Sequence, residues 1–140
     1  MGYRRRVEWS GRWGEPLPES ELFASESFGT RISGRDNVVW LALGGELDVF
    51  TAPRLKEALE EATPTGTESL VLDLRGLSFI DSSGLAVILG VHQKLADAED
   101  RELRLIIKGS LAVEALFETI GAADYLAIID NPGALSASGS

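Results

Sequence analysis

Cysteine is absent from the 140-residue chain, and histidine occurs once. The missing thiols exclude disulfide bonds, cysteine nucleophiles and thiolate metal ligands. A single imidazole with no other soft ligand also argues against a zinc site. We therefore expect no resident metal or cofactor, and the lack of cysteine is typical of a protein of the cytoplasm.

Basic residues and long hydrophobic runs are also scarce. The 13 lysines and arginines stand against 22 aspartates and glutamates, which gives a formal net charge of -9. A chain of this charge does not favour nucleic acid or an anionic membrane surface. The longest strongly apolar run, residues 85–91, is far shorter than the roughly 20 residues that span a bilayer. We expect a neutral or basic protein as partner, with no direct nucleic-acid contact and no membrane.

Composition divides the chain into three parts. Residues 1–27 place Trp9 and Trp13 among arginines without any hydrophobic period, which indicates a flexible or loosely docked N-terminal extension. Whether this extension is passive or binds a partner stays open. Residues 131–140 are small and polar and form a C-terminal tail. The remaining residues, 28–130, are expected to fold as one domain.

Strand and helix patterns alternate through this domain. The predicted strands are 28–32, 38–43, 70–74, 103–107 and 126–129, and the predicted helices are 52–62, 83–98 and 110–120. Asp36 and Asn37 form the expected turn of a hairpin between the first two strands. Parallel strands need connections of helix length, so the later alternation indicates an α/β fold, a mixed sheet with helices packed against it.

Apolar positions within these elements predict which sides face the core. Residues 70–74 are nearly all apolar, which is typical of a central strand covered on both faces. Thr51 is expected to cap the first helix, Ser110 to open the third and Gly121 to end it. Inward-facing positions are predicted at Ala52, Leu55, Leu59 and Ala62 in the first helix and at Val113, Leu116, Phe117 and Ile120 in the third.

The junction formed by residues 79–85, Phe-Ile-Asp-Ser-Ser-Gly-Leu, is the most informative stretch. It places two hydroxyls at a predicted helix N-terminus, where unpaired N–H groups and a partial positive charge can hold a phosphate. Ser82 and Ser83 are therefore candidate switch residues. The alternative, from these residues alone, is that Asp81 or Ser82 is an ordinary N-cap worth about 1 kcal/mol to the helix.

The helix after this junction has two apolar sides. Val87, Gly90 and Val91 project away from the predicted core side, and Lys94 follows one turn later. Such a strip either marks an interaction surface or is covered by a neighbouring helix or loop of the same chain, and both interpretations stay open at this point. The core side consists of Leu85, Ile88, Leu89, His92 and Leu95.

No catalytic set emerges from the sequence. Ser82 and His92 lie about 15 Å apart along a helix, beyond the reach of a general base. The glycines form neither a nucleophile elbow nor a nucleotide-binding loop, so we expect no enzymatic activity. Carboxylates near strand ends are interpreted as turn and cap residues rather than magnesium ligands, namely Glu46, Asp48, Asp73 and Asp81.

Three blocks, taken in order, carry a resemblance to a known family. They are Gly45-Glu46-Leu47-Asp48 with Thr51-Ala52, then Leu72-Asp73-Leu74 followed by the junction 79–85, and finally Ser110 through Leu116-Phe117-Glu118 to Gly121. In this order and spacing the chain resembles the anti-sigma factor antagonist family of STAS domains over residues 28–130. The resemblance implies a single STAS-like domain, a mixed sheet of four or five strands with helices mainly on one face.

The resemblance also implies a regulatory role in bacteria. In this family the unphosphorylated antagonist binds an anti-sigma factor that is also a serine kinase, and so releases the sigma factor. The kinase uses ATP and Mg²⁺ to phosphorylate the first serine of the Asp-Ser-Ser-Gly block, and a serine phosphatase removes the phosphate. Carried onto this sequence, the phosphorylation site is Ser82, with Ser83 beside it and Asp48 at the same surface.

The expected partner-binding residues combine the junction with the apolar strip on the following helix. Gly84 has no side chain and is expected to let a kinase backbone approach closely. The full set is Asp48, Asp81, Ser83, Gly84, Val87, Gly90, Val91 and Lys94. Two alternatives of other classes stay open: a constitutive STAS-like accessory subunit of a transporter or lipid-trafficking complex, and a small hydrolase or nucleotide-binding enzyme.

Overall fold

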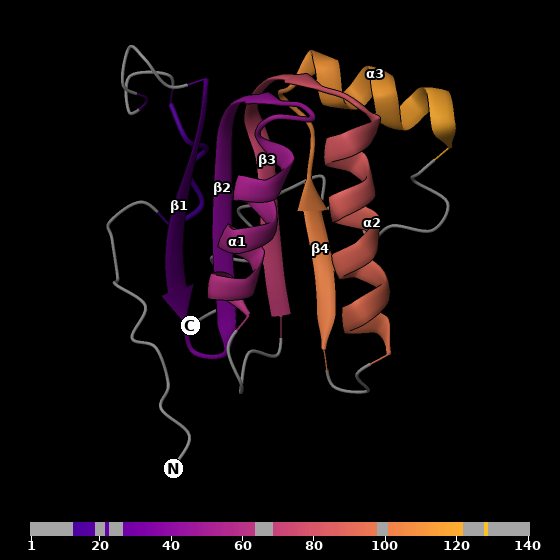
Figure 1. The fold of residues 1–140 in the computed structure, drawn as a ribbon. Helices are drawn as coiled ribbons and strands as arrows, with labels where there is room; N and C mark the ends of the chain where they lie inside the picture. The colour runs from indigo at the N-terminus through magenta and orange to yellow at the C-terminus, as the bar shows by residue number, and fades with distance from the viewer. Residues whose placement is uncertain are drawn as a thin grey trace.

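The computed structural model describes residues 13–18, 22, 27–63, 69–97, 101–121 and 128. Its strands are β1 (Phe28–Arg35), β2 (Val38–Leu47), β3 (Ser69–Ile80) and β4 (Glu102–Ile106), and its helices are α1 (Ala52–Ala62), α2 (Ser82–Ala96) and α3 (Leu111–Ile120). The strands form one sheet in the order β1-β2-β3-β4, with β1 antiparallel to β2 and the others parallel (Figure 1). The predicted mixed α/β fold is confirmed.

The helices cover one face of the sheet and its upper end. In Figure 1, α1 and α2 stand in front of the strands, and α3 lies at the end to which the β4 arrow points. Strand β2 alternates between two apolar layers: Leu41 and Leu43 belong to the core beneath the helices, whereas Trp40 and Ala42 belong to a second cluster. Apolar residues on both faces explain the continuous hydrophobic run of this strand.

Residues 13–18 cover the opposite face of the sheet. The Trp13 ring packs edge-on against Trp40 with ring centres 4.9 Å apart, and Leu17 is buried in the same cluster. Of the two interpretations, flexible or loosely docked, the packing of residues 13–18 favours the docked one for this segment. Individual aromatic and aliphatic side chains pack this segment against the sheet. The segment has no hydrophobic period that would predict a helix or strand, so this packing could not be read from the sequence.

A buried ion pair lies under this segment. Asp73 is fully buried, and its Oδ2 accepts hydrogen bonds from Trp40 Nε1 at 3.2 Å and from Arg75 Nη2 at 2.8 Å. Arg75 Nη2 also donates to the carbonyl oxygen of Gly14 at 2.7 Å. The charges thus compensate each other and fasten the N-terminal segment to β3. Asp73 Oδ1 also accepts from the Arg75 amide at 3.1 Å, a local bond of the kind predicted for a turn residue, but the burial of the carboxylate and its ion pair were not predicted.

The predicted hairpin is confirmed, and its second strand and β3 are longer than predicted. Asp36 has a φ of 55°, the left-handed backbone that a tight hairpin turn requires. The prediction placed the third strand at residues 70–74, the nearly all-apolar run. In the structure Arg75 pairs with Asp73, and β3 continues to Ile80.

The last predicted elements are confirmed in part. Val113 and Phe117 are buried as predicted, whereas Ile120 is 37% exposed because the last turn of α3 faces solvent. Of the predicted strand 126–129, the structure describes Ile128, which forms a parallel bridge with Leu105. The predicted tail 131–140 lies outside the described residues. Among the helices that are described, none is long and apolar enough to span a bilayer.

Candidate functional site

Two aspartates follow neighbouring parallel strands at the upper edge of the sheet. Leu47 and Ile80 are partners in the register of β2 and β3, so Asp48 and Asp81 come next on each strand. The amide of Asp81 donates to the carbonyl oxygen of Leu47 at 3.1 Å, which ties the two strand ends together. The expected placement of Asp48 at the edge that carries the serines is confirmed.

Asp81 is the N-cap of α2. Its backbone is extended, and its Oδ1 accepts hydrogen bonds from the amides of Ser83 at 2.9 Å and Gly84 at 3.2 Å. The choice between Asp81 and Ser82 as the cap is thereby settled. Ser82 is the first residue of the helix, its side chain is exposed, and its hydroxyl makes no hydrogen bond to a described residue. A capped helix N-terminus therefore presents a serine hydroxyl to solvent.

Asp48 and Thr51 hold the turn beside this serine. Oδ1 of Asp48 accepts hydrogen bonds from the amides of Phe50 at 2.9 Å and Thr51 at 3.0 Å. The Thr51 hydroxyl accepts from the amide of Asp48 at 2.9 Å and donates to the carbonyl oxygen of Glu46 at 2.8 Å. Thr51 is the N-cap residue of α1 as predicted, but its hydroxyl is directed back into the turn and makes no hydrogen bond to the helix amides. These bonds fix the turn geometry.

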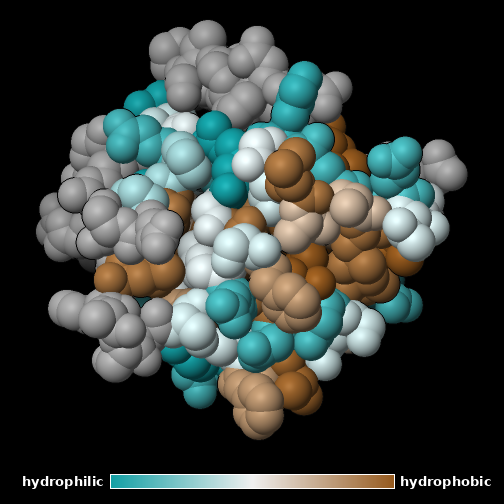
Figure 2. Space-filling model, turned by 90° about the horizontal axis from the view of Figure 1, so that it is seen from above, coloured by the Kyte–Doolittle hydropathy of each residue, from teal (hydrophilic) through white to brown (hydrophobic). Residues whose placement is uncertain are grey.

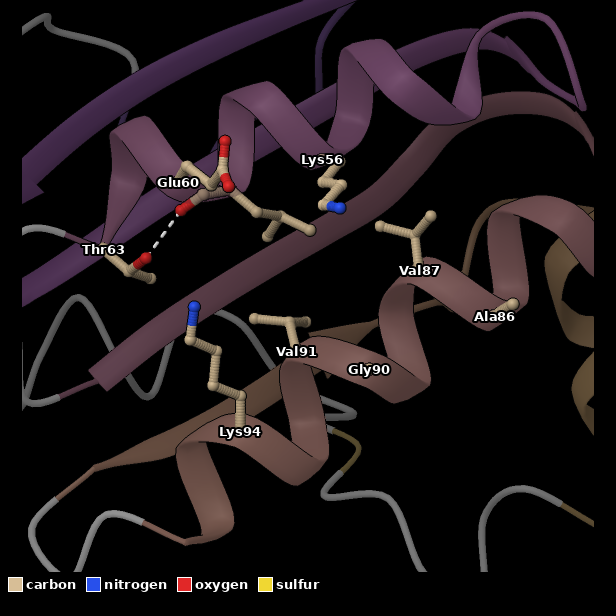
Figure 3. Close-up of a pocket in the computed structure, with 9 residues that line it drawn as sticks. Lys56, Glu60, Thr63, Ala86, Val87, Gly90, Val91 and Lys94 are labelled. Atoms are coloured by element: carbon tan, nitrogen blue, oxygen red, sulfur yellow. Dashed lines mark hydrogen bonds between the residues drawn. The ribbon is translucent and has the colours of Figure 1, made fainter.

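A groove runs between α1 and α2 (Figure 3). Its volume is about 420 Å³, within the range of small-molecule sites. Figure 3 shows Val87 and Val91 of α2 pointing toward α1, with Lys56 and Lys94 at either end of the valine pair. The groove is lined by Lys56, Leu59, Glu60, Thr63, Ala86, Val87, Gly90, Val91 and Lys94.

The serines stand at the upper end of this groove. Helical side chains four positions apart share a face, so Ser82 stands one turn above Ala86, and Ser83 one turn above Val87. Both Ala86 and Val87 line the groove. The strip predicted from the sequence is therefore one wall of a groove whose upper end, at Ala86 and Val87, lies one helical turn from the two serines. Helix α1 lies beside the strip without covering it, since Gly90 is exposed and Val87 and Val91 are half-buried, so of the two interpretations coverage by this helix is not observed.

The α1 wall was not predicted. Lys56, Glu60 and Thr63 flank the apolar stripe of α1, which the sequence assigned to the core alone. The spacing of these three residues, one helical turn apart, indicates that they share a face of α1. The distance between α1 and α2, which opens the groove, cannot be obtained from the hydrophobic period of either helix. Within the described residues, Lys56 and Lys94 form no ion pair, so both cations remain available on a chain of net charge -9.

Gly84 is placed differently from the prediction. The residue is buried, and a Cβ built on it would lie 2.6 Å from Leu47 Cδ2 and overlap Leu47 Cγ. The expectation that Gly84 offers open backbone to a kinase is therefore wrong. Its missing side chain instead lets the first turn of α2 pack against the end of β2.

Gly90 is the contrasting glycine on the same helix. A Cβ at this position would meet nothing within 4 Å, and the residue is exposed on the groove. We expect Gly90→Ala to stabilise the protein by about 0.5–1 kcal/mol, because alanine has the higher helix propensity and lowers the entropy of the unfolded chain. Urea unfolding followed by circular dichroism measures this change, and a destabilised variant would contradict an open groove.

The described residues contain no group of three or more His, Cys, Asp or Glu side chains able to hold a metal ion. Asp48 and Asp81 each direct Oδ1 into their own turn or cap. Chemically, the arrangement offers an accessible hydroxyl and an apolar groove. Such an arrangement suits modification and binding.

A model of the STAS domain matches residues 30–134, which is most of the chain. The chain belongs to the STAS domain family. The anti-sigma-B factor antagonist of Staphylococcus aureus (strain NCTC 8325 / PS 47) is 35% identical to this STAS protein over 92 residues, 66% of this chain and 83% of that protein. The anti-sigma-B factor antagonist of Listeria monocytogenes is 35% identical over 95 residues, 67% of this chain and 81% of that protein.

Solved STAS structures show the same fold. An anti-sigma factor antagonist from Mycobacterium paratuberculosis superposes with a TM-score of 0.72 at 26% identity, covering 83% of this chain and 97% of that one. The phosphorylated form of SpoIIAA from Bacillus gives a TM-score of 0.57 at 22% identity, covering 79% and 98%. The predicted family and fold are confirmed, and the similar proteins are anti-sigma factor antagonists rather than transporter subunits.

Proposed function

We propose that this STAS protein is an anti-sigma factor antagonist controlled at Ser82. Its unphosphorylated form binds an anti-sigma factor with serine kinase activity in the cytoplasm, and the sigma factor is released. Phosphorylation of Ser82 ends this binding, and a serine phosphatase restores it. The observation that carries the proposal is the exposed Ser82 hydroxyl, which stands beyond the Asp81 cap at the upper end of an open apolar groove.

The position of Ser82 suits modification by a kinase. The hydroxyl is exposed, and the Asp81 carboxylate binds the amides that follow rather than the hydroxyl itself. The kinase binds ATP and Mg²⁺ and catalyses the transfer, so this chain needs no nucleotide site and catalyses no reaction of its own. Ser83 is a less accessible acceptor, because it is half-buried.

A phosphate on Ser82 is compatible with the fold and incompatible with the bound partner. It adds about 1.5 to 2 negative charges at pH 7 beside the helix N-terminus, whose partial positive charge favours an anion. A partner covering the groove would place this charge against Ala86 and Val87 and remove its water. Burying an unpaired charge is costly, so the complex dissociates while the domain stays folded.

The partner-binding surface follows from this arrangement. The groove residues Val87, Gly90, Val91 and Lys94 contact the partner, and the edge residues Asp48, Asp81 and Ser83 border the contact. Lys56, Leu59, Glu60 and Thr63 of α1 join this surface from the opposite wall.

Replacing Ser82 by a glutamate tests the switch. We expect Ser82→Glu to weaken binding of the anti-sigma factor by at least about tenfold, because the carboxylate carries part of the phosphate's charge to the same place. Ser82→Ala keeps the groove apolar and should bind as the wild type does. The measurement is isothermal titration calorimetry with each purified kinase-type anti-sigma factor of the host.

Thr119→Glu on the exposed last turn of α3 is the matched control, because it adds one negative charge away from the groove. Equal affinities for Ser82→Glu and the wild type would contradict the switch. Constitutive capture of a transporter or lipid-trafficking complex, unaffected by Ser82→Glu, would replace it by the accessory-subunit function.

A further inference from the structure

Exposed hydrophobic side chains gather at the edge of the sheet that carries Ser82. In the part of the chain that the structure describes, five large hydrophobic residues are exposed, and four of them belong to segments at this edge. We call these four the edge surface: Val49 at 58%, Phe50 at 85%, Phe79 at 46% and Leu111 at 84% exposure. None of the four was predicted from the sequence to be a binding residue.

The backbone brings the four residues to one edge. Val49 and Phe50 follow the carboxyl end of β2, and Phe79 is the penultimate residue of β3. Leu111 opens α3 directly after Ser110, whose hydroxyl donates to the carbonyl oxygen of Leu77 on β3 at 2.7 Å. Figure 2 looks down on this end of the molecule and shows hydrophobic side chains standing among hydrophilic ones.

Phe50 is held in its exposed position by the turn. Its amide donates to Asp48 Oδ1 at 2.9 Å, and the bonds of Thr51 fix the next residue. An aromatic ring on a fixed turn loses little conformational freedom when a partner covers it, which makes it a good anchor for binding. The fold gains nothing from the ring, because Phe50 is 85% exposed.

We propose that Phe50 is the anchor by which this protein docks on the same anti-sigma factor, with Phe79 and Leu111 completing the contact. This inference rests on the proposed function. The ring of Phe50 fills an apolar pocket of the partner, and the edge surface lies at the same end of the sheet as Ser82. The hydrogen bond between the Asp81 amide and the Leu47 carbonyl oxygen joins the start of α2 to the strand end from which Phe50 follows.

Charge argues against a second copy of this chain as the occupant. Glu46, Asp48 and Asp81 lie among the hydrophobic residues of this edge, and the whole chain carries a net charge of -9. A symmetric contact through this edge would bring the same carboxylates together, which is unfavourable. A partner with an apolar pocket and a neutral or basic border meets no such repulsion.

The test compares Phe50→Ala with Ile120→Ala, in which the fifth exposed hydrophobic residue, at the far end of α3, is truncated. The probes are the purified kinase-type anti-sigma factors of the host, titrated against the full chain by calorimetry. We expect Phe50→Ala to raise Kd by about 30-fold and Ile120→Ala to leave it nearly unchanged. Thermal unfolding should be the same for both variants and the wild type.

Three results would overturn the proposal. If Phe50→Ala binds as the wild type does while Ser82→Glu does not, the anchor is wrong and the proposed function stands. If no kinase-type anti-sigma factor binds the wild type, the proposed function and the anchor fail together. If light scattering shows a wild-type dimer that Phe50→Ala converts to monomer, with unchanged partner affinity, a second copy is the occupant of this edge.

Discussion

Asp73→Ala is expected to destabilise the domain by about 3–5 kcal/mol, a large part of the stability of a small protein. The variant leaves Trp40 Nε1 without its acceptor and the Arg75 guanidinium without its counter-charge. It also removes the group that positions Arg75 against the Gly14 carbonyl oxygen. Residues 13–18 would then lose their main polar attachment to the sheet.

Urea unfolding followed by circular dichroism measures this effect. Glu102→Ala is the matched control, because Glu102 forms an ion pair with Arg104 in which both side chains are well exposed. Exposed pairs contribute between about 0 and 1 kcal/mol, so the control should be close to the wild type. A decrease of less than about 1 kcal/mol in the unfolding free energy of Asp73→Ala would contradict the proposed attachment of residues 13–18 to the sheet through the Asp73–Arg75 pair.

Gly84→Val is expected to cost about 3 kcal/mol and to shift the first turn of α2. The new Cβ overlaps Leu47, which is itself fully buried at the end of β2 and cannot move into solvent. The turn that would shift carries Ser82. The rate of Ser82 phosphorylation should therefore fall in the variant, because the serine is displaced with the first turn of α2. The rate is measured at a temperature where the variant remains folded.

Gly90→Val is the control on the same helix. It makes the same Gly→Val change, and valine is the better helix former of the two residues, but its Cβ meets nothing within 4 Å. The difference in unfolding free energy between the two valine variants therefore isolates the contact with Leu47. Equal free energies for both would contradict the burial of Gly84.

Local signals predicted much of this fold. The Asp36-Asn37 turn, the apolar stripe of α1 and the capping of α2 depend on neighbours within a few residues, and each is confirmed. The identity of the cap was left between Asp81 and Ser82, because the decision depends on the backbone angle at which the strand enters the helix. The extended backbone of Asp81 decides it.

Contacts between distant residues could not be predicted in this way. Trp13 reaches Trp40 from the N-terminal segment through one ring contact, which leaves no period in the sequence. The burial of Gly84 could not be predicted, because it depends on Leu47 packing against the first turn of α2. The α1 wall of the groove requires the spacing of two helices, which their separate hydrophobic patterns do not contain.

Site mapping of phosphate on the purified protein tests the central claim most directly. The chain is incubated with ATP, Mg²⁺ and each kinase-type anti-sigma factor of the host, and then analysed by intact mass and tandem mass spectrometry. The account predicts a single phosphate on Ser82 that is lost in Ser82→Ala. Phosphate on Ser83 instead, or no phosphate from a kinase that binds the chain, would contradict it.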